Sequence, residues 1–301
     1  MKTYPSVMTV AGFDPSGGAG IQADIKTISA LGCYATSALT ALPVQNTMGV
    51  RSIHSIPTAV VAEQMRAVMD DIPPHAIKIG MVHSVELVEA IVGVLGDYPR
   101  VPTVFDPVMV ATSGHKLIEE ATIAAIVERL FPLADVITPN LDEAAVLAGM
   151  AIETVDDMYA AGEKILALGC RSLLLKGGHL KTDRLTSLFF ERGCAHGNAN
   201  SNSNGEVCSH GNAGGEIGRS VNVAEYHSEK WNTRNTHGSG CTLSSAIASF
   251  LARGSELSAA VVLAQDYVKG AIFNGKDVTI GCGNGPLNHF YDPQPLCPTE
   301  R

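Results

Sequence analysis

The run Asn235 to Thr242, NTHGSGCT, has the residue types and spacing of an anion-binding turn. Gly238 and Gly240 come directly before an amphipathic helical pattern. Glycines at a helix start let several backbone N–H groups point to one spot, and the helix dipole adds positive potential there. We therefore predict that Gly238, Ser239 and Gly240 bind an anionic group.

Cys241 follows these glycines and falls in the first turn of the expected helix. The positive potential at a helix N-terminus lowers the pKa of a thiol. A thiolate at this place could accept a proton from an alcohol or stabilise a developing charge. A small core cysteine behind a glycine-rich turn has the same spacing, so both interpretations stay open.

A second glycine-rich loop, AGFDPSGGAG, occupies residues 11–20 after an apolar run. Its spacing fits neither G-x-G-x-x-G nor G-x-x-x-x-G-K-[ST], which argues against a dinucleotide fold or a P-loop. Its small residues still allow the backbone to approach a ligand. Asp24, in the first turn of the next helix, could bind a ligand or interact only with the helix dipole.

Three further motifs place polar residues after or within apolar runs. Lys176, within LKGGH, suits a phosphate charge, although a surface lysine before a turn is the alternative. Asn140 and Glu143, within TPNLDE, could organise Mg²⁺ and phosphate, or form a capping box. Gln45 lies in an uncharged stretch, where its amide could bind a neutral heteroaromatic ligand. The alternative is a loop amide that hydrogen-bonds to its own backbone.

Apolar runs alternate with amphipathic runs along the chain, and this order predicts parallel strands with covering helices. We expect strands at 7–11, 76–79, 101–105, 136–138, 172–175 and 185–190. We expect helices at 21–31, 60–69, 85–95, 121–130, 156–168, 242–251 and 257–273. In such sheets, ligands bind at the carboxyl ends of the strands, where the polar motifs above occur.

Residues 195–220 break this pattern, because 15 of these 26 residues are Gly, Asn or Ser. Such a segment cannot form a core, and we expect a flexible surface insertion. Cys194 directly precedes it, and His196, Cys208 and His210 lie within it. Each Cys–His pair is separated by one residue, which is fewer than separate the paired ligands of a zinc knuckle. A solvated loop is therefore favoured over a metal site.

Composition limits the class of protein. The 301 residues are 46% hydrophobic with a net charge of −9, which supports a large core and disfavours nucleic acid as a partner. Residues 27–50 carry no charge, but their Gly, Pro, Gln and Asn predict a helix end, a buried strand and a loop, not a membrane span. No signal peptide is visible, and seven dispersed cysteines favour reduced thiols in the cytoplasm.

Taken together, these motifs resemble the ribokinase superfamily and, within it, the hydroxymethylpyrimidine/phosphomethylpyrimidine kinases of thiamine biosynthesis. The resemblance covers nearly the whole chain except residues 195–220. It rests on AGFDPSGGAGIQADIKT, VQNTMGV, KIGM, DPVMVATSG, TPNLDEA, KGGH, NTHGSGCTLSSAIA and GPLNHF.

The resemblance implies a single α/β domain over residues 1–301, a three-layer sandwich whose central, mostly parallel sheet has helices on both faces and a small lid. It implies transfer of the ATP γ-phosphoryl group to a pyrimidine hydroxymethyl, then of a second one to the monophosphate. ATP and Mg²⁺ are the implied cofactors, and a homodimer is the implied assembly.

The resemblance also assigns residue roles. Gly238 to Cys241 match the anion hole, with Cys241 where most of the superfamily has an Asp base. Lys176 matches a residue near the transferred phosphates, and Asn140 and Glu143 match the Mg²⁺/phosphate motif, with Glu143 acting through water. The residues matching the pyrimidine pocket are Gln45, Ala19, Asp24, Met81 and Val108.

Three other functions remain possible from the sequence. A pyridoxal kinase has the same fold, although Gln45 with Met81 favours the pyrimidine. A hydrolase or transferase with Cys241 as nucleophile would need a base, and His237 is four residues away. A non-catalytic pyrimidine sensor would not need Lys176 and Glu143.

Overall fold

The computed structural model describes residues 2–109, 118–178, 184–193 and 221–300. An eight-stranded sheet forms its centre, in the order β11-β10-β9-β8-β7-β6-β2-β3. The strands are β2 (Ser6–Ala11), β3 (Tyr34–Leu39), β6 (Ala76–Ile79), β7 (Thr103–Phe105), β8 (Val136–Ile137), β9 (Ser172–Gly177), β10 (Arg184–Arg192) and β11 (Val221–Glu229). The six strands from β3 to β9 in this order run parallel, and β10 is antiparallel to both of its neighbours, β9 and β11.

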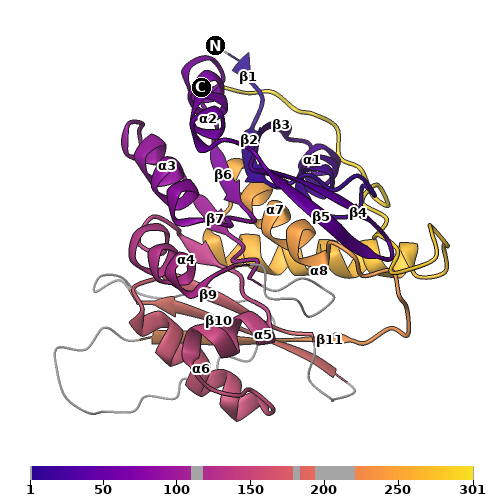
Figure 1. Cartoon of the computed structure of the whole chain (residues 1–301). Helices are drawn as coiled ribbons and strands as arrows, with labels where there is room; N and C mark the ends of the chain where they lie inside the picture. The colour runs from indigo at the N-terminus through magenta and orange to yellow at the C-terminus, as the bar shows by residue number, and fades with distance from the viewer. Residues whose placement is uncertain (1, 110–117, 179–183, 194–220, 301) are drawn as a thin grey trace.

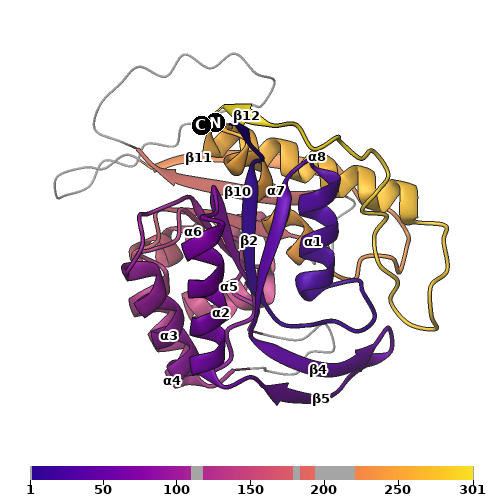
Figure 2. The same cartoon turned by 90° about the horizontal axis from the view of Figure 1, so that it is seen from above.

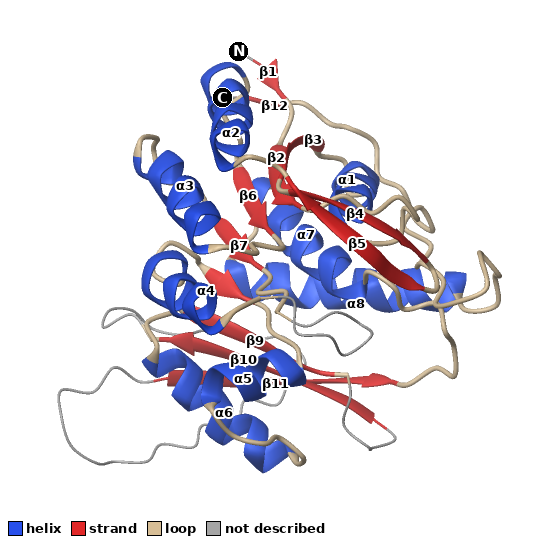
Figure 3. Ribbon diagram, in the orientation of Figure 1, coloured by secondary structure: helices blue, strands red, loops and turns tan. Residues whose placement is uncertain are grey.

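Helices cover both faces of the sheet, which confirms the predicted α/β sandwich (Figures 1 and 3). One face carries α1 (Gly20–Ala30), α7 (Ser239–Ala252) and α8 (Leu257–Gly275). The other carries α2 (Thr58–Asp71), α3 (Val85–Gly96), α4 (Glu120–Ala125) with a π-helical turn at Ile126–Leu130, α5 (Leu141–Ala148) and α6 (Val155–Ala167). Within the described residues, no helix is both long and apolar enough to cross a membrane.

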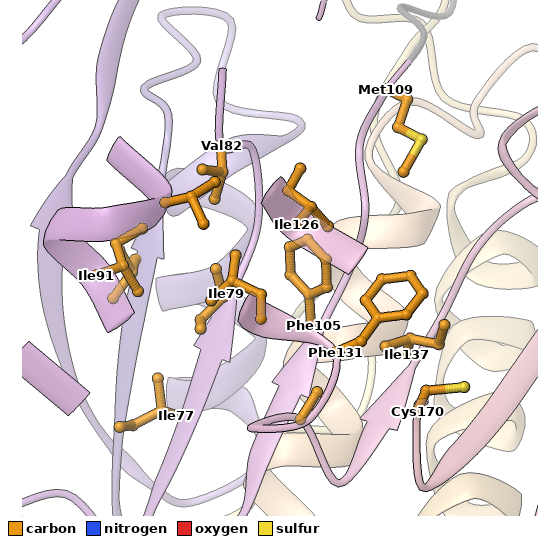
Figure 4. Close-up of a cluster of buried hydrophobic side chains, with 14 of the residues drawn as sticks. Ile77, Ile79, Val82, Ile91, Phe105, Met109, Ile126, Phe131, Ile137 and Cys170 are labelled. Carbon is orange, nitrogen blue, oxygen red and sulfur yellow. The ribbon is translucent and has the colours of Figure 1, made fainter. Parts of the chain in front are cut away.

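Successive residues of each strand point to opposite faces, so every central strand contributes to two cores. Val10 packs toward the α2–α6 face, whereas Val7 packs toward the α1, α7 and α8 face. Figure 4 shows the first of these cores, where Phe105 and Phe131 meet edge to face with ring centroids 6.3 Å apart. Both cores lie beneath the carboxyl ends of the strands and hold that edge rigid.

A two-stranded hairpin of β4 (Ala41–Asn46) and β5 (Gly49–Ser55) projects beyond the main sheet and corresponds to the expected small lid (Figure 2). The prediction for residues 27–50 was therefore wrong in part, because paired strands replace the expected loop. The apolar residues of β4 do not make it a buried strand, because Leu42 and Val44 are exposed and only Ala41 is buried. A second small pair joins β1 (Lys2–Thr3) to β12 (Thr299–Glu300).

Strand β11 was not predicted, because its polar sequence adjoins the Gly/Asn/Ser-rich segment. It pairs with β10 along its whole length, up to Arg192 opposite Val221. The predicted insertion at 195–220 and the four potential metal ligands, Cys194, His196, Cys208 and His210, lie outside the described residues.

Candidate active site

The loops after the parallel strands and the first turns of two helices meet at one edge of the sheet, where α/β proteins bind ligands. A Cβ atom at Gly238 would lie 1.8 Å from the carbonyl oxygen of Gly18, so the two glycine-rich segments are in contact. Gly238 has a φ of 82°, which favours glycine, and it precedes Ser239, the first residue of α7. The sequence prediction that this turn begins a helix is confirmed.

Lys176 and Asp106 face the first turn of α7. A Cβ atom at Gly240 would lie 3.2 Å from Nζ of Lys176 and 3.4 Å from Oδ2 of Asp106. Lys176 Nζ lies 3.0 Å from Asp106 Oδ1, which also accepts a hydrogen bond from the Thr138 hydroxyl at 2.9 Å. The structure thus brings together the predicted anion-binding turn and the predicted phosphate-binding lysine.

Charges within this group shift one another's pKa values. Burial alone would raise the pKa of Asp106, but the ammonium groups of Lys176 and Lys78 hold it below its usual value. Burial alone would lower the pKa of Lys176, but Asp106 and Glu143 raise it. Lys176 therefore carries a positive charge and Asp106 a negative one beside the α7 N-terminus.

Asn140 and Glu143 form a capping box at the start of α5, as one of the two sequence interpretations predicted. The Glu143 carboxylate also accepts a hydrogen bond from the backbone N–H of Met109 at 3.4 Å. Burial raises the pKa of Glu143 to about 7, and the negative charge of Asp106 adds to this effect against the opposing charge of Lys176. A cation beside Glu143 would relieve this cost.

Cys241 lies where the N-termini of α1 and α7 meet, and the backbone N–H of Gly20 donates toward its sulfur. The expected lowering of its pKa is nevertheless wrong. Burial raises the pKa of the thiol to about 11, and the carboxylates of Asp24 and Asp106 add to the effect, which Lys78 only partly opposes. The thiol is protonated at neutral pH in the absence of substrates.

Asp14 was missed by sequence reasoning, yet its buried carboxylate joins three parts of the site. It accepts hydrogen bonds from the N–H groups of Gly18 at 3.1 Å and Ala19 at 2.7 Å. Its Oδ2 atom lies 2.9 Å from Nε2 of His237, and the Gln45 side chain also bonds to it. Burial alone would raise the pKa of Asp14, but these hydrogen bonds hold it well below its usual value. The Asp-Pro-Ser turn signal was the available clue.

Four of the five residues predicted to line a pyrimidine pocket are partly exposed around this edge: Gln45, Ala19, Met81 and Val108. Ala19 is the N-cap of α1, and Gln45 lies near the tip of the lid hairpin. Met81 follows β6, and its methyl group would lie 3.8 Å from a Cβ atom at Gly12. Val108 follows β7 and donates its backbone N–H to the Asp106 carbonyl.

Asp24 differs from its predicted position, because its side chain is fully buried. Its carboxylate pairs with Lys78 at 2.8 Å and accepts hydrogen bonds from Thr9 at 2.6 Å and Ser245 at 2.7 Å. The side chain lies one turn deeper than expected, since α1 begins at Gly20. Asp24 therefore faces the interior below the site and not an open pocket.

Comparison with known proteins gives consistent matches. The family model described as phosphomethylpyrimidine kinase matches residues 14–214 and 217–288. A hydroxymethylpyrimidine/phosphomethylpyrimidine kinase of Rhizobium meliloti is 42% identical, over 94% of this chain and 96% of its own length. An ADP complex of Bacillus subtilis pyridoxal kinase is 32% identical with a TM-score of 0.79, covering 95% of this chain and 98% of that one.

Some relatives are much longer than this chain. The thiamine biosynthesis bifunctional protein ThiED of Geobacter sulfurreducens is 42% identical over 95% of this chain, but the match covers only 52% of that protein. The chain thus spans about half the length of the bifunctional relatives that it matches.

Proposed function

Because the chain belongs to the phosphomethylpyrimidine kinase family, we propose that it uses ATP to phosphorylate 4-amino-5-hydroxymethyl-2-methylpyrimidine and then the resulting monophosphate, in thiamine biosynthesis. One observation carries the proposal: Lys176 and Asp106 lie against Gly240 at the N-terminus of α7. Phosphoryl transfer needs positioning and charge stabilisation more than covalent chemistry, and this arrangement supplies both.

In the first step, the pyrimidine hydroxyl oxygen attacks the γ-phosphorus of ATP. The bond to the bridging oxygen of ADP breaks, and the hydroxyl proton passes to Cys241 in its thiolate form, which is a minor fraction of the free enzyme at neutral pH because the thiol pKa is about 11. The N–H groups of the turn from Gly238 to Cys241 and the Lys176 ammonium stabilise the charge that develops on the transferred group.

In the second step, the acceptor is a phosphate oxygen, which is already largely ionised near neutral pH. No proton needs to be removed, so Cys241 has little to do as a base. The same backbone N–H groups and Lys176 stabilise the transferred group. One site therefore serves both steps, with the thiol needed mainly in the first.

The residues beside Lys176 fit a magnesium ion. Mg²⁺ in nucleotide-transferring sites is commonly held by one or two carboxylates, waters and the substrate phosphates. Glu143, whose ionised form is costly in its buried place, would hold the ion through water, with Asn140 beside it at the same helix start. The ion, when bound with ATP, neutralises phosphate charge.

Substrate selection is proposed to rest on Gln45, with Ala19, Met81 and Val108 as neighbours. The Asp14 carboxylate can only accept hydrogen bonds, so the Gln45 amide donates to it. The amide oxygen of Gln45 is then available to accept from an amino group. An aminopyrimidine offers such a donor next to a ring nitrogen that accepts, which supports this substrate.

The alternative of a pyridoxal kinase rests on structural likeness and on lower identity, 32% against 42%. A Cys241 nucleophile is less favoured, because activated thiols have lowered pKa values whereas burial raises this one to about 11. His237, the base that such an enzyme would need, has its Nε2 atom bonded to Asp14.

Assembly and location complete the proposal. We propose a homodimer in the cytoplasm, built from a single domain over residues 1–301. The lid hairpin supports the dimer, because it exposes five large apolar side chains that a second copy would cover. They are Leu42, Val44, Met48, Val50 and Ile53.

The proposal is tested by incubating the purified chain with ATP, Mg²⁺ and the pyrimidine alcohol while products are followed by mass spectrometry. The expected result is a monophosphate that appears first and then declines as the diphosphate forms. ATP hydrolysis without phosphorylated pyrimidine, or no turnover, would contradict the proposal.

A further inference from the structure

Lys78 of β6 and Asp24 of α1 form an ion pair whose side chains are both fully buried. Nζ of Lys78 lies 3.0 Å and 2.8 Å from the two carboxylate oxygens of Asp24. Burying two charges costs hydration free energy, and well-packed apolar residues often stabilise a protein as much or more. Stability alone therefore gives a weak reason for this pair, which raises the question of what the charges do.

The ion pair lies beside the first turns of α7. Asp24 accepts a hydrogen bond from Ser245 of α7, which is four residues after Cys241 and so on the same face of the helix. A Cβ atom at Gly80, directly after β6, would lie 2.8 Å from Nζ of Lys78. The ammonium is thus held at the carboxyl end of β6, and Asp24 links it to the face of α7 that carries Ser245 and Cys241.

Four charged groups from different parts of the chain act on Cys241. Lys78 of β6 favours the thiolate, whereas Asp24 of α1 and Asp106, which follows β7, disfavour it. Lys176 of β9 also interacts with the Cys241 charge. After burial, which favours the neutral thiol, the Lys78 ammonium has the largest effect and the opposite sign.

We propose that Lys78 is a positioning residue for the first phosphoryl transfer, and that its buried ammonium, fixed by Asp24, stabilises the Cys241 thiolate that takes the proton of the substrate hydroxyl. The inference rests on the proposed function. The proton moves from hydroxyl oxygen to sulfur as the oxygen–phosphorus bond forms, and Lys78 keeps its own protons throughout. Asp24 then serves to hold the cation without contacting the substrate.

The two partners of the ion pair provide a test with opposite expectations. Removal of the Lys78 charge should disfavour the thiolate, whereas removal of the Asp24 charge should favour it. A pair with only a structural role predicts the same direction for both variants, because each loses the same contact.

The rate of Cys241 alkylation by iodoacetamide is measured against pH, with peptide mass spectrometry to separate Cys241 from the other cysteines. Lys78→Met should slow alkylation roughly tenfold at a fixed pH below the thiol pKa, and Asp24→Asn should accelerate it roughly tenfold. Lys164→Met, at an exposed position of α6, is the matched control and should change neither rate nor pH profile.

The same variants are then assayed in both phosphorylation steps. Lys78→Met should lose activity in alcohol phosphorylation and keep it in monophosphate phosphorylation. Alkylation rates that change in the same direction in both variants, or that do not change, would overturn the role of Lys78. An equal loss of activity in both phosphorylation steps of Lys78→Met would overturn it as well. Alkylation is measured without ATP or pyrimidine. The alkylation result therefore tests the role of Lys78 independently, and the kinase activity of the wild type is tested by its own assay. If Lys78→Met does not fold, the accelerated alkylation expected for Asp24→Asn carries the test, and unchanged or slower alkylation would refute it.

Discussion

His237 and Asp14 are 223 residues apart in the sequence, yet Nε2 of His237 lies 2.9 Å from Oδ2 of Asp14. This contact ties the glycine-rich loop after β2 to the turn that begins α7. The Asp14 carboxylate also accepts the N–H groups of Gly18 and Ala19, so it fixes the loop from inside. One buried carboxylate thereby sets the distance between the candidate substrate pocket and the candidate phosphate site.

Replacing Asp14 should therefore damage activity more than a lost surface charge would. Asp14→Asn puts an amide NH₂ group against backbone N–H donors, which forces the loop to move. A displacement near 1 Å can cost about 10²-fold in rate. We expect kcat/KM for the pyrimidine alcohol to fall by about that factor, measured by ADP release. Asp97→Asn, at the exposed end of α3, is the control, and an equal effect in both variants would contradict the role of Asp14.

Gly240 tests the anion-binding turn. A side chain there would meet Lys176 and Asp106 at 3.2 Å and 3.4 Å and occupy the space that we propose for a phosphate group. Gly240→Val should lower kcat by roughly 10²–10³-fold, as the loss of a transition-state donor does. Gly93→Val is the control, because a Cβ atom at Gly93 in α3 has no neighbour within 4 Å. Near-native turnover of Gly240→Val would place phosphate binding elsewhere.

The sequence predicted those parts of the site that depend on local chemistry. The turn from Gly238 to Cys241 and Lys176 at the end of β9 were found because a helix start and a strand end can be recognised from neighbouring residues. Asp14 and the Lys78–Asp24 pair were missed, because their roles depend on partners 223 and 54 residues away. The pKa of Cys241 was predicted in the wrong direction for the same reason, since burial comes from tertiary packing.

The fold shows a similar division. The apolar runs of β2, β6 and β9 predicted their strands, because buried parallel strands are nearly continuous in hydrophobicity. The side chains of β5 are mostly exposed, and those of β11 are a mixture of exposed and half-buried. Neither strand therefore has the continuous apolar run that predicts a buried strand. Their pairing depends on the partner strand and not on their own sequence.

Glu143 should make the stability of the free protein depend on pH. Its pKa is raised in the folded protein to about 7 from the ordinary value of 4.5, so its stabilising contribution is present below pH 4.5 and is lost as the pH rises through 7. Glu143→Gln removes this loss, so we expect the Tm of the variant, relative to wild type, to increase between pH 5 and pH 8. A Tm difference that stays constant with pH would contradict the raised pKa.

The exposed Glu163→Gln on α6 is the matched control for this measurement. Addition of Mg²⁺ with ATP at pH 8 should raise the Tm of wild type more than that of Glu143→Gln. Equal increases would show that Glu143 does not contribute to holding the ion.

Cys241 separates the two phosphorylation steps. Removing a general base costs about 10²–10⁴-fold, so Cys241→Ala should depress alcohol phosphorylation by that range and spare monophosphate phosphorylation. Because the thiol pKa is about 11, the rate of the first step in wild type should rise with pH between 7 and 10, whereas the second should not. Cys297→Ala, at an exposed position, is the control. An equal loss in both steps would leave Cys241 as part of the turn's geometry only.

The central claim is that this chain phosphorylates an aminopyrimidine alcohol. Its most direct test is ATP consumption with 4-amino-5-hydroxymethyl-2-methylpyrimidine and with pyridoxal, measured side by side at the same enzyme and Mg²⁺ concentrations. We predict a higher kcat/KM for the pyrimidine, and a loss of that preference in Gln45→Leu, which removes the amide. A higher kcat/KM for pyridoxal, or turnover of neither alcohol, would contradict the account.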